Sequence, residues 1–103
     1  MNYDLEFVLN SFLSKEEVKD LSRKLSQTTS LDHGELVRAI CLREKNAVDI
    51  EKTMFNKLLL SFLDSTWDEY DVEMVRLKLN IPDSKTKTEI LVKIIDGLSS
   101  MSS

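Results

Sequence analysis

The chain has 103 residues, and its 14 basic and 18 acidic side chains give a formal charge of -4. This length fits one small domain with a single hydrophobic core. The acidic balance gives no general attraction for nucleic acid or an anionic membrane, so any polyanion site has to be a local patch. No apolar run reaches the length of a membrane span, and the single Cys41 cannot form an intramolecular disulfide. We expect an intracellular protein, cytoplasmic or nuclear, with no membrane partner.

Two glycines and one proline leave few interruptions, and the apolar residues recur at helical spacing. This pattern predicts an all-α fold, a compact six-helix domain over residues 1–98. The polar tail at 99–103 is expected to be flexible.

The first half of the chain predicts three amphipathic helices. Ser14 and Glu17 form a capping box that starts the second helix directly after the first. Asp32 with Glu35 starts the third helix after a polar loop at 26–30. The residues predicted to face inward are Leu5, Val8, Leu9, Phe12, Leu13, Val18, Leu21, Leu25, Leu36, Val37 and Ile40.

The second half predicts three more helices. Asn46 with Asp49 can cap the fourth, and Pro82 forces the fifth to end before it. Thr86 and Glu89 form a capping box that starts the sixth. The apolar residues of these helices are Val48, Ile50, Met54, Phe55, Leu58, Leu59, Leu60, Phe62, Leu63, Trp67, Tyr70, Val72, Val75, Leu79, Ile90, Leu91, Ile94, Ile95 and Leu98.

The two halves also resemble each other. Residues of the second and third predicted helices recur 54 positions later, and the capping pair at Asp32 falls on the pair at Thr86. The first helix aligns with the fourth at a spacing of 50, so the halves differ by about one helical turn. We predict two duplicated three-helix units, with pseudo-repeats at about 3–43 and 47–98. The alternative is a chance alignment of capped helices of similar length.

The loop and helix start after residue 79 carry the most distinctive pattern. Its members are Ile81, Pro82, Ser84, Lys87, Glu89, Ile90, Leu91 and Ile94. This pattern resembles the second half of a SAP domain, a helix, extended loop, helix module associated mainly with DNA binding. The resemblance covers about residues 69–98, with a degenerate second copy near 15–42.

Two glycines of the SAP pattern are replaced in this chain. Asn80 takes the first place and tolerates a left-handed backbone, whereas Lys85 takes the second and does so poorly. We therefore expect the path of the loop to depart from that of the family near Lys85.

DNA binding at this loop would use cations and amides at the start of the last helix. The candidate residues are Arg76, Lys78, Ser84, Lys85, Thr86 and Lys87. The local surplus of positive charge is small, which predicts weak and strongly salt-sensitive binding. The alternative is that these lysines form an ordinary solvated helix face.

An acidic segment lies just upstream and offers a second hypothesis, a protein-interaction or regulatory module. Its candidate partner-binding residues are Asp64, Trp67, Asp68, Glu69 and Asp71. Trp67 could anchor a basic partner, or it could pack in the core while the carboxylates cap the next helix. An apolar groove between the two halves could also bind a partner, including a second copy of the chain.

Catalysis has little support in the sequence. His33 and Cys41 are the only histidine and cysteine, and neither has a partner at the spacing of a catalytic triad or metal site. No glycine-rich phosphate loop is present. We expect a binding module without enzymatic activity, cofactor or metal.

Overall fold

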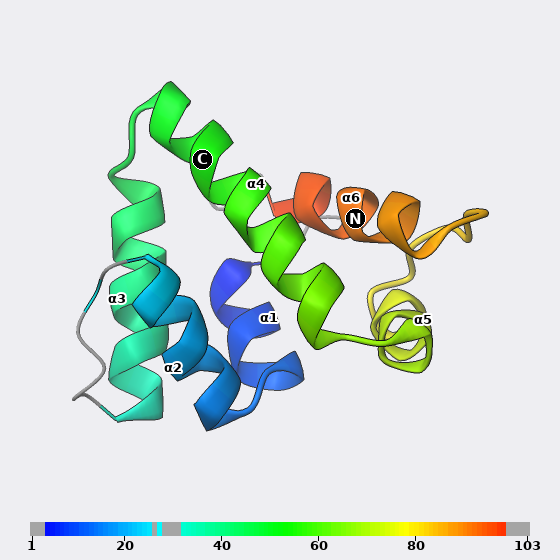
Figure 1. Ribbon diagram of the computed structural model, residues 1–103, viewed down its shortest axis with the longest axis horizontal. Helices are drawn as coiled ribbons and strands as arrows, with labels where there is room; N and C mark the ends of the chain where they lie inside the picture. The colour runs from blue at the N-terminus through cyan, green and yellow to red at the C-terminus, as the bar shows by residue number, and fades with distance from the viewer. Residues whose placement is uncertain (1–3, 26, 28–31, 99–103) are drawn as a thin grey trace.

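Helices form throughout the part of the chain that the computed structural model describes, residues 4–25, 27 and 32–98 (Figure 1). They are α1 (Leu5–Phe12), α2 (Lys15–Lys24), α3 (His33–Lys45), α4 (Asp49–Thr66), α5 (Glu69–Lys78) and α6 (Lys87–Gly97). These ranges contain six helices and no strand, so the all-α prediction is confirmed. Most of the predicted loop at 26–30 and the tail at 99–103 lie outside the described residues.

Side-chain caps fix the starts of several helices. Ser14 Oγ accepts the Glu17 backbone N–H at 3.1 Å, and Glu17 Oε1 accepts the Ser14 N–H at 2.8 Å. Asp32 Oδ1 accepts the Glu35 N–H at 2.9 Å at the start of α3. These bonds satisfy amides that have no partner inside the helix, so the predicted starts of α2 and α3 are confirmed.

The start of α4 differs from the prediction. Asn46 closes α3 instead, donating its N–H to the carbonyl of Leu42 at 3.1 Å. Val48 is the residue before α4, and its N–H donates to Glu51 Oε1 at 3.0 Å. The chain needs two residues to turn between the helices, so the cap of α4 falls after Asn46 and before Asp49.

The helices pack in two sets around one core. α1 and α2 contact α3, α4 and α5 contact α6, and α4 also contacts α2. The buried apolar residues are Leu5, Val8, Leu9, Leu13, Val18, Leu21, Leu25, Leu36, Val37, Ile40, Phe55, Leu59, Phe62, Leu63, Trp67, Val72, Val75, Leu79, Ile81, Ile90, Leu91, Ile94, Ile95 and Leu98. Nearly all of them belong to the predicted inward faces.

Four of the apolar residues assigned to the predicted fourth and fifth helices are exposed. Val48, Ile50 and Met54 are 60%, 70% and 65% exposed, and Tyr70 on α5 is 75% exposed. The first three lie where α4 extends past its packing partners, so an apolar side chain there finds no neighbouring helix to cover it. Phe12, Leu58 and Leu60 are only partly buried against the core.

Helix boundaries in the two sets recur at one spacing. The first and last residues of α5 each lie 54 positions after those of α2. The first residue of α6 lies 54 positions after that of α3, and the last residue of α4 lies 54 positions after that of α1. The buried residues Leu5, Val8 and Leu9 of α1 likewise correspond to the buried Leu59, Phe62 and Leu63 of α4. The helix ends and buried residues therefore favour aligning α1 with α4 at a spacing of 54, not at the spacing of 50 taken from the sequence. The duplication itself stays a prediction.

Candidate functional site

The loop between α5 and α6 begins with a tight backbone motif. Asn80 has φ 57°, and no other non-glycine residue in the described part of the chain has a positive φ. Its N–H donates to the Leu77 carbonyl at 3.3 Å, and the Ile81 N–H donates to the Arg76 carbonyl at 3.0 Å. This pair of bonds is a Schellman motif, which ends α5. Asn80 therefore has the left-handed backbone that glycine adopts most easily, whereas Lys85 has no positive φ.

Arg76 holds this loop against α5. Its Nε donates to Glu73 Oε1 at 2.8 Å, and its Nη1 donates to the Ile81 carbonyl at 3.1 Å. Asp83 Oδ1 lies 3.8 Å from Nε, and the Arg76 side chain is only 13% exposed. The hydrogen bond from Arg76 lowers the pKa of Glu73 below its ordinary value, so both groups stay charged. The guanidinium is therefore occupied by internal partners.

Lys87 also has an internal partner. Its Nζ donates to the Asp64 carbonyl at 2.7 Å and lies 3.6 Å from Asp64 Oδ1, which ties the start of α6 to α4. Thr86 Oγ1 accepts the Glu89 N–H at 3.1 Å, as the capping pair predicts. A hollow of about 430 Å³ beside this helix start is lined by Glu69, Val72, Glu73, Ser84, Lys85, Thr86, Lys87 and Ile90.

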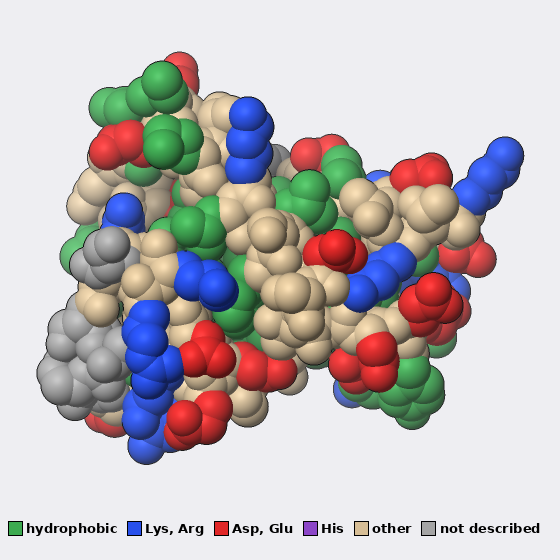
Figure 2. Space-filling model, viewed as in Figure 1, with side chains coloured by type: hydrophobic (Ala, Val, Ile, Leu, Met, Phe, Trp, Pro, Cys, Tyr) green, Lys and Arg blue, Asp and Glu red, His purple; other side chains and the backbone are tan. Residues whose placement is uncertain are grey.

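The candidate DNA-binding residues do not form one basic surface. Ser84, Lys85, Thr86 and Lys87 share the hollow with two glutamates, whereas Lys78 lines a separate hollow next to Asp71. Figure 2 shows acidic and basic side chains interspersed around this end of the molecule, at the right of the view. The positive charge that a phosphate would meet is therefore limited mainly to exposed Lys85 and Lys78.

The acidic segment mainly serves helix ends. Asp68 Oδ1 accepts the Asp71 N–H at 2.8 Å, and Asp71 Oδ2 accepts the Asp68 N–H at 3.3 Å, so the two residues cap α5. Asp64 faces Lys87. Trp67 is 4% exposed and packs in the core, so its ring is not available as an exposed anchor.

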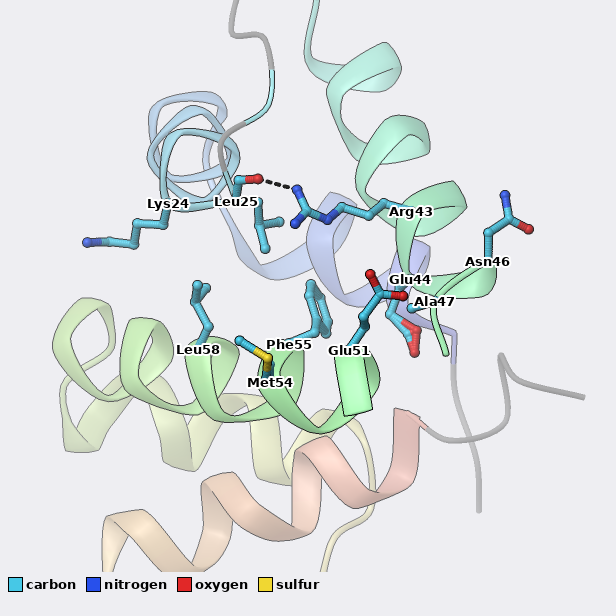
Figure 3. A pocket seen from close by; sticks show the side chains of 10 residues that line it. All are labelled: Lys24, Leu25, Arg43, Glu44, Asn46, Ala47, Glu51, Met54, Phe55 and Leu58. Atoms are coloured by element: carbon cyan, nitrogen blue, oxygen red, sulfur yellow. Dashed lines mark hydrogen bonds between the residues drawn. The ribbon is translucent and has the colours of Figure 1, made fainter. Parts of the chain in front are cut away.

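A cleft of about 560 Å³ lies between the two sets of helices. It forms where residues 49–58 of α4, called the α4 extension because they have no counterpart in α1 at the spacing of 54, meet the ends of α2 and α3. Its lining residues are Lys24, Leu25, Arg43, Glu44, Asn46, Ala47, Glu51, Met54, Phe55 and Leu58. Figure 3 shows Met54, Phe55 and Leu58 pointing from α4 toward Leu25 on α2.

Some of the polar side chains that line the cleft have hydrogen-bond partners and others do not. Arg43 reaches across to donate a hydrogen bond to the Leu25 carbonyl (Figure 3). Glu51 Oε1 accepts the Val48 N–H. Lys24 and Asn46 point away from the cleft. Glu44 is different, because it is only 4% exposed and its buried Oε2 has no hydrogen-bond partner.

Burial of Glu44 has an electrostatic consequence. Loss of hydration raises the pKa of Glu44 above its ordinary value, and the positive charge of Lys52 opposes that rise. Glu44 also follows the apolar stripe of α3, four residues after Ile40 and seven after Val37. A carboxylate in register with an inward stripe is the sequence signal that could have identified this position, and the sequence interpretation missed it.

Exposed apolar side chains gather at the same corner of the molecule. We call Val48, Ile50 and Met54, around the start of α4, the apolar corner, and each is at least 60% exposed. Figure 2 shows hydrophobic side chains over the start of α4, at the upper left. Large exposed apolar groups next to a cleft are typical of an interaction surface.

Comparison with known proteins identifies neither the cleft nor the loop. No family model, curated protein or solved structure significantly matches this chain. The resemblance to SAP domains therefore rests on the residues of 69–98 alone and stays a prediction.

Cys41, the single cysteine, is partly buried against the core. Burial, followed in effect by the nearby carboxylates of Glu6, Asp4 and Glu44, raises the pKa of Cys41 to about 12. Within residues 4–25, 27 and 32–98, no group of three or more His, Cys, Asp or Glu side chains is placed to hold a metal ion. In the same ranges no helix has both the length and the apolar content needed to span a membrane.

Proposed function

We propose that this chain is a non-catalytic protein-interaction module that docks its partner at the cleft and the apolar corner. The observation that carries this proposal is the α4 extension. It leaves Ile50 and Met54 exposed and forms one wall of the cleft with Phe55 and Leu58.

An isolated domain loses stabilising free energy by leaving these apolar side chains exposed, and this supports the proposal. Ile50 and Met54 are 70% and 65% exposed, although burying a side chain of this size contributes about 1.5 to 3 kcal/mol. A partner that covers them gains that free energy without rearranging the core. Phe55 and Leu58 on the same helix already provide an apolar wall into which a partner side chain can fit.

Substitution of exposed residues tests where the module binds its partner. Met54→Asp places a charge in the apolar corner, and Leu77→Asp places one on α5, where Leu77 is similarly exposed at 59%. We expect proteins that co-purify with the tagged chain from its own cells to be lost with Met54→Asp and retained with Leu77→Asp. Circular dichroism should show both variants folded. Retention of the same proteins by Met54→Asp would refute the assignment.

Nucleic-acid binding is the second candidate, favoured by one observation. Lys85 is exposed beside Ser84 and Thr86 at the start of α6, where helix amides and dipole attract an anion. With Arg76 and Lys87 occupied by internal partners, any DNA complex would make few phosphate contacts and would be weak and salt-sensitive.

This candidate is tested by charge reversal at the exposed lysines. Lys78→Glu with Lys85→Glu should remove low-salt binding to duplex or single-stranded DNA in a mobility-shift assay while leaving the thermal unfolding midpoint nearly unchanged. If the unaltered chain shifts neither DNA at low salt, this candidate is eliminated.

A further inference from the structure

We propose that the cleft recognises a basic side chain, the lysine or arginine of a partner helix, by pairing its cationic end with Glu44 while its aliphatic arm lies against Phe55 and Leu58. This inference rests on the proposed docking function and names the chemistry of the occupant. It follows from what each polar group of the cleft already binds.

None of the cationic side chains around the cleft donates a hydrogen bond to Glu44 Oε2. Arg43 donates to the Leu25 carbonyl, and Lys24 points out of the cleft (Figure 3). Lys52 acts on the Glu44 carboxyl through its charge, yet Oε2 still has no hydrogen-bond partner. A buried carboxylate oxygen without a donor costs free energy, and an incoming donor would recover it.

The charge of this end of the cleft is negative. Glu44 and Glu51 both line the cleft, and Figure 3 draws them between the end of α3 and the start of α4. The guanidinium of Arg43 lies on the side of α2, bonded to Leu25. A cation therefore complements the Glu44 end, whereas an anion would meet two carboxylates.

The apolar lining of the cleft favours a cation with a hydrocarbon arm over a small inorganic ion. Leu25, Phe55 and Leu58 form apolar walls on the way to Glu44, and a lysine or arginine side chain has a hydrocarbon arm that packs on such walls. Glu51 and Met54 are exposed at the cleft, so rotation of their side chains can admit the arm. An amphipathic helix offers this cation together with apolar neighbours that cover Ile50 and Met54.

The test uses three small molecules that differ mainly in the charge of their end group. The chain labelled with nitrogen-15 is titrated with hexylammonium, hexanol and hexanoate, which share one hydrocarbon arm, and amide shifts are followed by NMR. Signals of Ala47, Met54 and Leu58 should move, while those of Thr88, an exposed residue at the start of α6, should not. We expect hexylammonium to bind about ten-fold more tightly than hexanol, and hexanoate more weakly than either.

Two variants assign the preference to one carboxyl group. Glu44→Gln keeps the shape and should reduce the ammonium preference to less than about two-fold, whereas Glu51→Gln should retain most of it. Lowering the pH until Glu44 is protonated should abolish the preference in the unaltered chain, a readout that does not depend on how a variant folds.

The outcomes separate this inference from the docking function. Equal binding of hexylammonium and hexanol at the cleft, or a preference that survives Glu44→Gln, overturns recognition by Glu44 and leaves apolar docking intact. Absence of shifts at the cleft with both probes overturns the docking site as well.

Discussion

Glu44 is a buried carboxylate on α3. It lies 54 residues before Leu98, and the two side chains are 4% and 0% exposed. An unpaired carboxylate in an apolar position destabilises the isolated fold, so its presence is most simply explained by a role in binding. The stability of the free chain should therefore improve when this group is removed.

Replacing Glu44 tests whether its buried carboxylate destabilises the free chain. Its raised pKa means that the folded chain keeps the proton to a higher pH than the unfolded chain does. The resulting stabilisation is complete below the ordinary carboxyl pKa and is lost as the pH rises through the raised value. In urea unfolding, Glu44→Leu should raise the free energy of unfolding at pH 7 by about 1 to 3 kcal/mol, with a smaller gain near pH 4.

The matched control for this experiment is Glu51→Leu, because Glu51 is exposed in the same cleft. Because it removes the hydrogen bond that Glu51 accepts from the Val48 N–H, it should lower rather than raise the free energy of unfolding. A Glu44→Leu variant that is less stable than the unaltered chain at pH 7 would mean that the carboxyl group has a stabilising partner.

Cys41 should be chemically inert in the folded chain. With a pKa of about 12, raised first by burial, its reactive thiolate form is scarce at neutral pH. Reaction with a disulfide reagent at pH 7.5 should be about 100-fold or more slower than in the urea-unfolded chain. Similar rates in the two states would show that Cys41 is accessible and ionised.

At the scale of single elements, the end of α5 depends on one residue. Asn80 holds φ 57°, a conformation that costs a residue with a Cβ about 1 to 2 kcal/mol unless its side chain eases it. Asn80→Ala should lower the free energy of unfolding by about 1 kcal/mol, while Asn80→Gly should be neutral or slightly stabilising. Thermal unfolding measures both, and equal effects of the two changes would refute the role of the backbone.

Helix starts were predictable because their signals are local. A capping side chain and its partner lie three residues apart, so the pairs at Ser14, Asp32 and Thr86 could be identified without any knowledge of tertiary packing. The partners of Arg76 and Lys87 could not be identified in this way. They are backbone carbonyls, of Ile81 and Asp64, that these side chains reach only after the chain folds.

The inward face of α4 was predictable only in part. Its apolar residues surround the helix, and which turns are buried depends on where neighbouring helices end. Phe55 and Leu59 meet the core, whereas Ile50 and Met54, nearer the start of the helix, remain exposed. The cleft was therefore beyond sequence reasoning, which proposed a groove between the halves but could not name its residues.

At the scale of the whole molecule, the two sets of helices share one pattern. The backbone N–H of Gln27 donates to the Ser22 carbonyl after α2, just as that of Ile81 donates to Arg76 after α5, 54 residues later. Together with the common helix boundaries, this similarity supports our proposal of two duplicated units. The α4 extension has no counterpart in α1 at this spacing, and it forms one wall of the cleft.

The central claim is that the partner docks on the α4 extension and the adjoining end of α3. Amide hydrogen exchange, compared between the free chain and the chain bound to its co-purified partner, maps that contact directly. We expect slower exchange on binding in residues 42–58, with little change in the loop at 80–86. Protection confined to that loop, with none in residues 42–58, would contradict the account.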